Sequence, residues 1–355
     1  MRLSSQIDVL AAIPYLIGFY PENSLVIVAI AGDPSGGELQ LTARGDLPLP
    51  GDWWEPVLRV LEREKITQVM LVGYGPGPSV TPVVEDALAR IPVPVVEALR
   101  VESDRYWSYL CANPSCCSPE GMPFDPAASA VPAEATLAGM VAMPDRAALE
   151  RSIAPFGGLT RLSMRQATDR AVAAVRERLG GRPSPRRTTE FVDEGLARLR
   201  AAVDLYRDGG RLDHDTAARL GLDLLVVRIR DDAWVRIDDG SRKAHTALWT
   251  DLTRRLEEPF LAAPTSLLAV TVWGEGACTL AGIAVDRALT ADPTYSMAHL
   301  LLHGLRNFVT PRLIRTGFGG PEHLAAEMGP PSPHWLAPLL IRLVDYRADD
   351  RRPAV

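Results

Sequence analysis

The first part of the chain alternates between short apolar runs and amphipathic stretches of helical period. Residues 24–31 form a run of strand length that is rich in β-branched residues and has no polar alternation, which is typical of a strand covered on both faces. Residues 38–47 alternate between polar and apolar side chains, so the two strands are predicted to form a hairpin. Before them, Ser4 or Ser5 can cap a helix with apolar residues at helical spacing, which Pro14 is expected to end or kink.

Two further helix and strand pairs follow this hairpin. Residues 53–65 carry apolar side chains on one helical face and charged side chains largely on the other. A strand is predicted over 66–74, a helix over 81–90 and another strand over 92–100. Strands that alternate with helices of this length predict an α/β domain, with a mainly parallel or mixed sheet and helices on its faces.

From residue 127 onward the apolar periodicity becomes helical. Residues 268–293 have small and apolar side chains at the spacings of one tetratricopeptide-like helix pair, and no second clear copy follows. This part is therefore predicted to be all-α and partly tetratricopeptide-like. The predicted helices cover residues 134–141, 146–153, 164–179, 190–206, 215–229, 245–256, 266–273, 279–289 and 295–309.

The length of 355 residues exceeds what one hydrophobic core usually organises, so two domains are expected. Residues 1–155 are predicted to form the α/β domain. Residues 156–187 are predicted to hold a helix and a linker rich in arginine, proline and glycine. Residues 188–355 are predicted to form the helical domain.

The charge balance argues against a general nucleic-acid binder, because the net charge is −6 and the pI about 5.6. Residues 151–200 nevertheless contain eleven arginines against five acidic residues. These arginines are not interleaved with a series of aromatic residues for base stacking, since only Phe156 and Phe191 lie among them. We therefore interpret them as solvated helix faces and linker, and a nucleic-acid contact is the less favoured alternative.

The sequence has no recognisable membrane span or targeting segment. Its most apolar early run, residues 9–20, falls short of the roughly 20 residues that cross a bilayer. The start also lacks the pattern of a signal peptide. We therefore expect a cytoplasmic protein, in which the four cysteines are thiols rather than disulfides.

The segment 100–125 concentrates unusual chemistry in a chain with only 6% aromatic residues. Thiolates suit zinc, but two adjacent cysteines strain a single tetrahedral site. A fourth ligand would have to come from Cys278 or from a histidine, and all histidines follow residue 210. We therefore expect structural thiols and no cofactor, with zinc as the less favoured alternative. The cysteines and aromatic residues of this segment are Cys111, Cys116, Cys117, Tyr106, Trp107 and Tyr109.

Charged residues at strand ends give the candidates for ligand binding. Arg44 and Asp46 end one predicted strand, and Arg105 follows another. They are expected to converge with Tyr106, Trp107 and Tyr109 at the carboxyl edge of the sheet, where open α/β sheets place their sites. Surface ion pairs are the simpler account of the charged residues, and a ligand pocket is the alternative.

Known catalytic motifs are missing from the sequence. It has no Walker lysine, no His-Glu-x-x-His, no Gly-x-Ser-x-Gly and no set of kinase motifs. The glycine-rich turn at 73–78 contains Pro76 and Pro78, which lack the N–H groups that cradle phosphate. No catalytic residue is assigned, and whether the protein is an enzyme stays open.

Several stretches resemble the family called domain of unknown function 4192, which is known mainly from actinobacteria. They are the Ile-Pro-Tyr-Leu-Ile-Gly-Phe of residues 13–19, the turn at 73–76, and above all residues 105–109 with 116–121. The likeness covers most of the chain, including residues 276–293. It implies no activity and brings no catalytic residue.

Two functions remain. The preferred one is a non-enzymatic interaction or adaptor protein, whose helical domain docks a protein partner or a second copy. The alternative is an enzyme or small-ligand sensor with a pocket at the strand ends, lined by residues 105–117.

Overall fold

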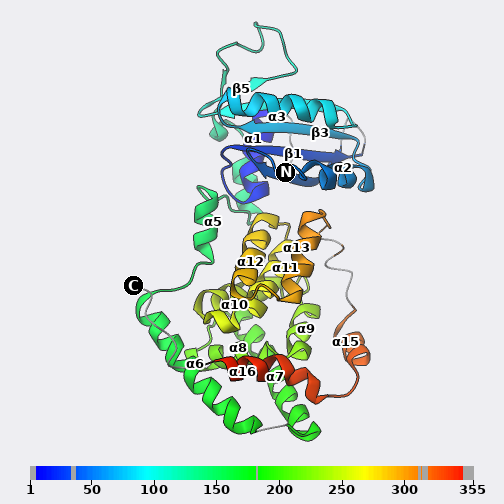
Figure 1. Ribbon diagram of the computed structural model, residues 1–355. Coiled ribbons are helices and arrows are strands. Elements are labelled where there is room, and N and C mark those ends of the chain that lie inside the picture. Colours follow the sequence, from blue (N-terminus) through cyan, green and yellow to red (C-terminus); the bar gives the residue numbers. More distant parts are fainter. Residues whose placement is uncertain (1–4, 33–36, 181–182, 311–312, 314–318, 347–355) are drawn as a thin grey trace. The chain divides into compact units, whose positions relative to one another are not determined.

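The computed structural model describes residues 5–32, 37–180, 183–310, 313 and 319–346. The chain separates into two compact units (Figure 1). The first comprises residues 1–149 and 306–310, and the second comprises residues 150–305 and 311–355. The first unit contains a sheet with helices and the second is helical, which confirms the predicted fold class. Residues 181 and 182 of the expected linker lie outside the described residues.

A six-stranded sheet forms the centre of the first unit, in the order β2-β1-β3-β4-β5-β6. Among these strands only β3 and β4 are parallel neighbours. The sheet is therefore mixed, which is one of the two predicted forms. It is not mainly parallel, because β1 runs antiparallel to both β2 and β3, and β5 runs antiparallel to both β4 and β6. The strands are β1 (Ser24–Ala31), β2 (Glu38–Asp46), β3 (Gln68–Tyr74), β4 (Val95–Glu102), β5 (Arg105–Ser108) and β6 (Met122–Pro123).

Helices cover both faces of this sheet. Strand β1 is buried along almost its whole length, as the lack of polar alternation in its sequence predicts. The helices α2 (Trp54–Arg63) and α3 (Gly77–Arg90) pack their apolar side chains with Leu25 and Ile27 in one core. Helix α1 (Gln6–Ile17) lies against the opposite face, where Gln6 donates a hydrogen bond to Glu97 of β4 (2.8 Å).

The first helix begins as the sequence predicts but does not end at Pro14. The Ser5 hydroxyl caps it by accepting a hydrogen bond from the Asp8 amide (3.1 Å). Pro14 lies inside the helix, which continues to Ile17. It ends at Gly18, whose φ of +90° places the terminal amide on the Pro14 carbonyl.

The described residues after β6 are mainly helical. The helix expected over 215–229 is two helices, because the backbone becomes extended at Val226. Among the described residues, no helix has both the length and the apolar character needed to cross a membrane. The helices are α4 (Val131–Leu137), α5 (Arg146–Ser152), α6 (Gly158–Leu179), α7 (Pro185–Arg207), α8 (His214–Asp223), α9 (Val227–Val235), α10 (Arg242–Arg255), α11 (Ala262–Gly274), α12 (Cys278–Ala291), α13 (Ser296–Arg306), α15 (Pro321–Met328) and α16 (Ala337–Asp345).

Helix α11 is the central helix of the second unit, because all 13 of its residues are buried. It packs against α10 and α12. The pair α11 and α12 corresponds to the tetratricopeptide-like spacing in the sequence, and its likeness to such a repeat stays a prediction. Since α11 has no exposed face, a docking surface in this unit has to use other helices.

The arginine-rich stretch 151–200 is folded mainly into α6 and α7, where acidic residues of the same unit meet several of its arginines. Arg178 and Glu194 form a salt bridge between the two helices. Two further arginines reach aspartates of α8, in the pairs Arg170–Asp215 and Arg198–Asp223. Part of the positive charge is therefore used to hold α6, α7 and α8 together.

Candidate functional site

Arg44 and Asp46 lie at the end of β2 and form an ion pair with each other. Arg44 is opposite Val26 in the register, on the sheet face that carries α1. Its guanidinium carbon is 4.9 Å from the centre of the Phe19 ring, which follows α1. Arg44 therefore connects the end of β2 to the residue that follows the first helix.

These two residues do not converge with the candidates of the cysteine segment. One row of the sheet runs from Asp46 through Ser24, Tyr74 and Val101 to Tyr106. Four strand spacings of about 4.8 Å separate its ends by roughly 19 Å. The prediction of a single cleft is wrong because β1, β3 and β4 lie between the two groups.

Residues 105–108 form an additional strand, β5, that the sequence analysis missed. Ser103, with a φ of +55°, and Asp104 make the turn between β4 and β5. A Ser-Asp pair is a weaker hairpin signal than Asn-Gly. Because β5 runs back along β4, the chain leaves it beside Ala98, whose carbonyl accepts the Tyr109 amide hydrogen (2.8 Å). The expectation that the cysteines lie beyond the carboxyl edge of β4 is therefore wrong.

Trp107 is held between an arginine and the returning loop. The Arg100 guanidinium carbon is 3.7 Å from the centre of the Trp107 ring, a close cation–π contact. Arg100 also donates to Glu102 (2.5 Å). The indole Nε1 donates to the carbonyl of Pro119 (3.1 Å), which fixes the loop between β5 and β6 against the ring. Arg100 did not stand out in the sequence, because its role depends on the unrecognised hairpin.

Arg105 and Tyr109 also use their polar groups inside the first unit. The Arg105 guanidinium donates to the carbonyl of Gly121 (2.8 Å). The Tyr109 hydroxyl is 2.8 Å from the Thr81 hydroxyl of α3, and either group can donate. These contacts give both side chains a structural role in positioning the loop.

Gly121 provides a test of this packing. Its φ is +84°, and a Cβ there would lie 2.5 Å from the Trp107 ring. We expect Gly121→Ala to lower the free energy of unfolding by about 2–4 kcal/mol, from strain and overpacking together. Gly139→Ala is the matched control, because Gly139 has a φ of +81° but no atom near its missing Cβ. Chemical denaturation of both variants measures the difference, and equal losses would contradict the ring contact.

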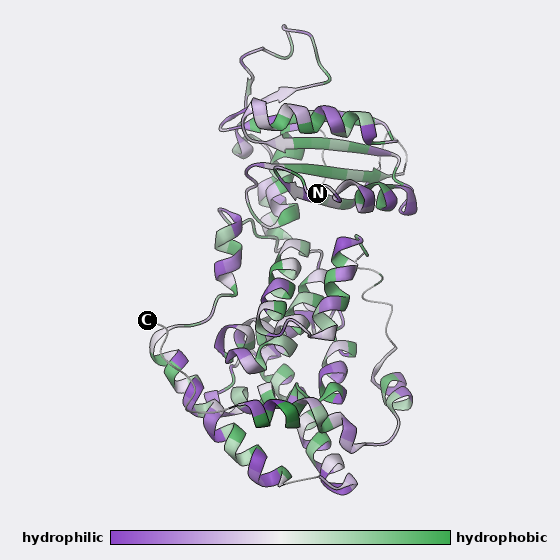
Figure 2. Cartoon of the chain, viewed as in Figure 1, coloured by the Kyte–Doolittle hydropathy of each residue, from purple (hydrophilic) through white to green (hydrophobic). Residues whose placement is uncertain are grey.

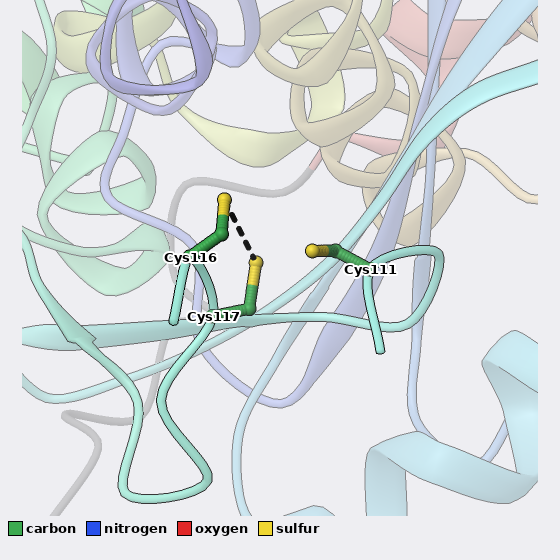
Figure 3. Close-up of side chains that lie close together, drawn as sticks. All are labelled: Cys111, Cys116 and Cys117. Atoms are coloured by element: carbon green, nitrogen blue, oxygen red, sulfur yellow. Dashed lines mark hydrogen bonds between the residues drawn. The ribbon is translucent and has the colours of Figure 1, made fainter. Parts of the chain in front are cut away.

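Three cysteines come together in the loop between β5 and β6. The Sγ atoms of Cys111, Cys116 and Cys117 all lie within 4.8 Å of one another, and none forms a disulfide. Figure 3 shows the three side chains close together, with Cys116 and Cys117 side by side and the sulfur of Cys111 directed toward Cys117. The Cys117 thiol donates a weak hydrogen bond to the Cys116 sulfur (3.9 Å). The cluster lies in the first unit, and Cys278 lies in the second.

The three thiols influence one another and Tyr106. Hydrogen bonding from Cys117 lowers the pKa of Cys111, and the same contact raises the pKa of Cys117 to about 12. Burial raises the pKa of Tyr106, and the nearby Cys117 and Glu97 add to the effect. Tyr106 itself is buried, with 9% of its surface exposed. The lowered pKa favours the thiolate of Cys111, whereas the raised pKa favours the thiol of Cys117.

The first unit has a surface pocket, and none of the ligand-binding residues predicted from the sequence lines it. That pocket is lined by Pro56, Arg59, Glu62, Arg63 and Asn307. Arg63 donates there to the carbonyls of Asn307 (3.2 Å) and Phe308 (2.6 Å), which ties residues 306–310 to α2.

Comparison with models of known protein families identifies the family to which the chain belongs. A family model described as Domain of unknown function (DUF4192) matches residues 7–312. The chain belongs to the DUF4192 family. The resemblance in the sequence motifs is thereby confirmed. A search of curated proteins and a search of solved structures each found no match.

The DUF4192 match includes the thiol cluster and the helix pair α11–α12, and it ends before α15 and α16. Its description names no reaction, ligand or partner, so it assigns no role to the residues described above. The function of this DUF4192 protein therefore has to be argued from its own contacts.

Proposed function

We propose that this DUF4192 protein is a non-enzymatic cytoplasmic interaction protein that associates through helix α16. The observation that supports the proposal is that α16 is apolar on two faces. Leu339 and Leu343 are buried against the second unit, whereas Ile341 and Val344 are 63% and 78% exposed. The ribbon of α16 is correspondingly hydrophobic along much of its length in Figure 2.

A helix that is apolar all round is normally buried, and large exposed apolar surfaces mark interaction sites. Helix α16 is also held firmly in place. Arg176 of α6 donates to the carbonyls of Leu343 (3.2 Å) and Tyr346 (2.5 Å), and Arg342 pairs with Asp292 (2.8 Å). The outer face is therefore presented by a fixed helix, which lowers the entropic cost of association.

The occupant that we propose for this face is a second copy of the chain. Ala337, Ile341 and Val344 are exposed at helical spacings of four and three residues, and they form one stripe. A single stripe can cover itself across a two-fold axis, because the same patch then serves both copies. The small Ala337 at one end allows two antiparallel helices to approach closely.

The enzyme or sensor alternative has less support. Arg105 and Tyr109 make hydrogen bonds inside the first unit, and Arg44 pairs with Asp46. Arg44 and Asp46 also lie roughly four strand spacings, or about 19 Å, from β5, whose residues were expected to share their pocket. A ligand at the loop would have to be held by the aromatic and sulfur groups alone.

The double variant Ile341→Asp, Val344→Asp tests the proposal. We expect the wild-type protein to be a dimer and the variant to associate at least about 100-fold more weakly, because four carboxylates would face one another. Both positions are exposed, so the stability should change by less than about 1 kcal/mol. Sedimentation equilibrium measures the association. Leu300→Asp, an exposed leucine on α13, is the control and should leave it unchanged.

A wild-type protein that is monomeric at all measurable concentrations would overturn self-association. Wild type and double variant then serve as paired baits for affinity capture from native lysate. A stoichiometric partner that binds the wild type and not the double variant would still support the adaptor function. If neither self-association nor such a partner is found, the proposed function is wrong.

A further inference from the structure

We infer that Cys111, Cys116 and Cys117 form a zinc site with three thiolate ligands and an open fourth position. The inference rests on the first unit alone and is independent of association through α16. The three Sγ atoms lie within 4.8 Å of one another, and the sulfur of Cys111 is directed toward Cys117, which lies beside Cys116 (Figure 3).

The distances between the sulfur atoms suit a tetrahedral metal site. A Zn–S bond of about 2.3 Å places two tetrahedral thiolate ligands about 3.8 Å apart. Cys116 and Cys117 are already 3.9 Å apart, and no pair in the cluster exceeds 4.8 Å. A disulfide would need a sulfur separation of about 2.05 Å, so bridging requires a larger rearrangement than metal binding.

The backbone between Cys111 and Cys117 removes the objection that adjacent cysteines cannot serve one ion. The amides of Cys116 and Cys117 both donate to the carbonyl of Asn113, at 3.1 and 2.8 Å. The Asn113 side chain accepts the amide hydrogen of Ser115 (3.0 Å). This tight turn directs neighbouring side chains to the same side, where Cys111 meets them.

The start of the loop and its return to the sheet are also anchored. The Ser108 hydroxyl accepts the Cys111 amide hydrogen (3.2 Å) at the end of β5. On the returning side, Trp107 and Arg105 hold the carbonyls of Pro119 and Gly121. Two fixed ends leave the thiols little freedom to separate, and such preorganisation favours metal binding.

The surroundings allow an ion to enter and leave one coordination position free. Cys116 is exposed, whereas Cys111 and Cys117 are half-buried. Among the described residues these three are the only group of potential metal ligands that lie this close together. Sites with three protein ligands keep the fourth position for water or an incoming ligand. The soft sulfur donors favour zinc over hard cations such as magnesium or calcium.

Metal analysis of the full chain, purified under reducing conditions, tests the site. We expect one equivalent of zinc per wild-type chain. Cys111→Ser, Cys116→Ser and Cys117→Ser should each weaken zinc binding by more than about 100-fold, since even loss of a group that supports a ligand costs 10- to 100-fold. Cys278→Ser is the matched control and should bind zinc like the wild type, because Cys278 belongs to the second unit.

Cobalt substitution gives a readout that does not depend on zinc affinity. Cobalt bound by the wild type should show sulfur-to-metal charge-transfer absorption, and each loop variant should lose about one third of it or bind no cobalt. Far-ultraviolet circular dichroism establishes that the variants are folded. Zinc binding that survives all three loop substitutions, or a reduced wild-type protein that binds no zinc, would overturn the inference.

Discussion

Replacement of Asp223 with alanine is expected to lower the free energy of unfolding by about 3–5 kcal/mol, the range for removing one partner of a buried ion pair. The Asp223 side chain is 0% exposed and accepts hydrogen bonds from Arg198 (2.7 Å) and Arg219 (3.0 Å). The variant would leave these two guanidinium groups without their shared anion. Both arginines also have a buried Nη2 atom without a hydrogen-bond partner. The carboxylate of Asp223 is therefore the main group that offsets the cost of burying their positive charges.

Asp215→Ala is the matched control, because Asp215 lies in the same helix, α8, and also pairs with an arginine. Its partner Arg170 is 59% exposed and Asp215 itself is 64% exposed, so the pair should contribute below about 1 kcal/mol. Denaturant unfolding of the two variants compares the pairs directly. If Asp223→Ala costs no more than Asp215→Ala, then Asp223 does not hold α7 and α8 together as described.

The elements that the sequence predicted correctly are those with a strong local signal. Apart from Ser24, the run 24–31 has no polar residue to place in water, which favours an internal strand. The amphipathic residues 53–65 have one apolar face, and the structure places a helix there at Trp54–Arg63. In both cases the local pattern and the final packing agree, which makes the assignment secure.

The missed elements depend on contacts between residues far apart in the sequence. The turn at Ser103 and Asp104 has no glycine or asparagine, so nothing local indicated that β5 returns along β4. Without that hairpin, the Arg100–Trp107 contact cannot be foreseen. The order of the strands across the sheet likewise depends on all of them together. The prediction of a single cleft was wrong because β1, β3 and β4 lie between Arg44 and β5.

The sequence indicated which residues make up the candidate site, but it did not indicate how their side chains are arranged. The cysteines and aromatic residues of the segment 100–125 stood out because both residue types are scarce elsewhere. Nothing in the spacing of the cysteines indicated that the adjacent side chains would face the same side. The reason is the turn at Asn113, a short-range hydrogen-bond arrangement that spacing rules do not capture.

His245 is a buried base in the second unit. It is 1% exposed on α10, 5.7 Å from the Trp249 ring, and its Nδ1 atom is buried without a hydrogen-bond partner. Burial lowers the pKa of His245 to about 4. Asp238 opposes this effect, and its own pKa is lowered by hydrogen bonds from Ser241. The neighbouring charges that reinforce the lowered pKa are Arg207, Arg242 and Arg236.

The stability of the protein is therefore expected to fall as the pH drops from about 6.5 to about 4. Between these two pH values His245 binds a proton in the unfolded chain but not in the folded chain. Above pH 6.5 the His245 side chain is neutral in both the folded and the unfolded chain. The full loss is about 3 kcal/mol, from a pKa difference of about 2.5 units. Denaturant unfolding across this range should show a shallower acid slope for His245→Asn than for wild type. His299→Asn, at an exposed histidine, is the control, and equal slopes in all three proteins would show that His245 is not the group that titrates.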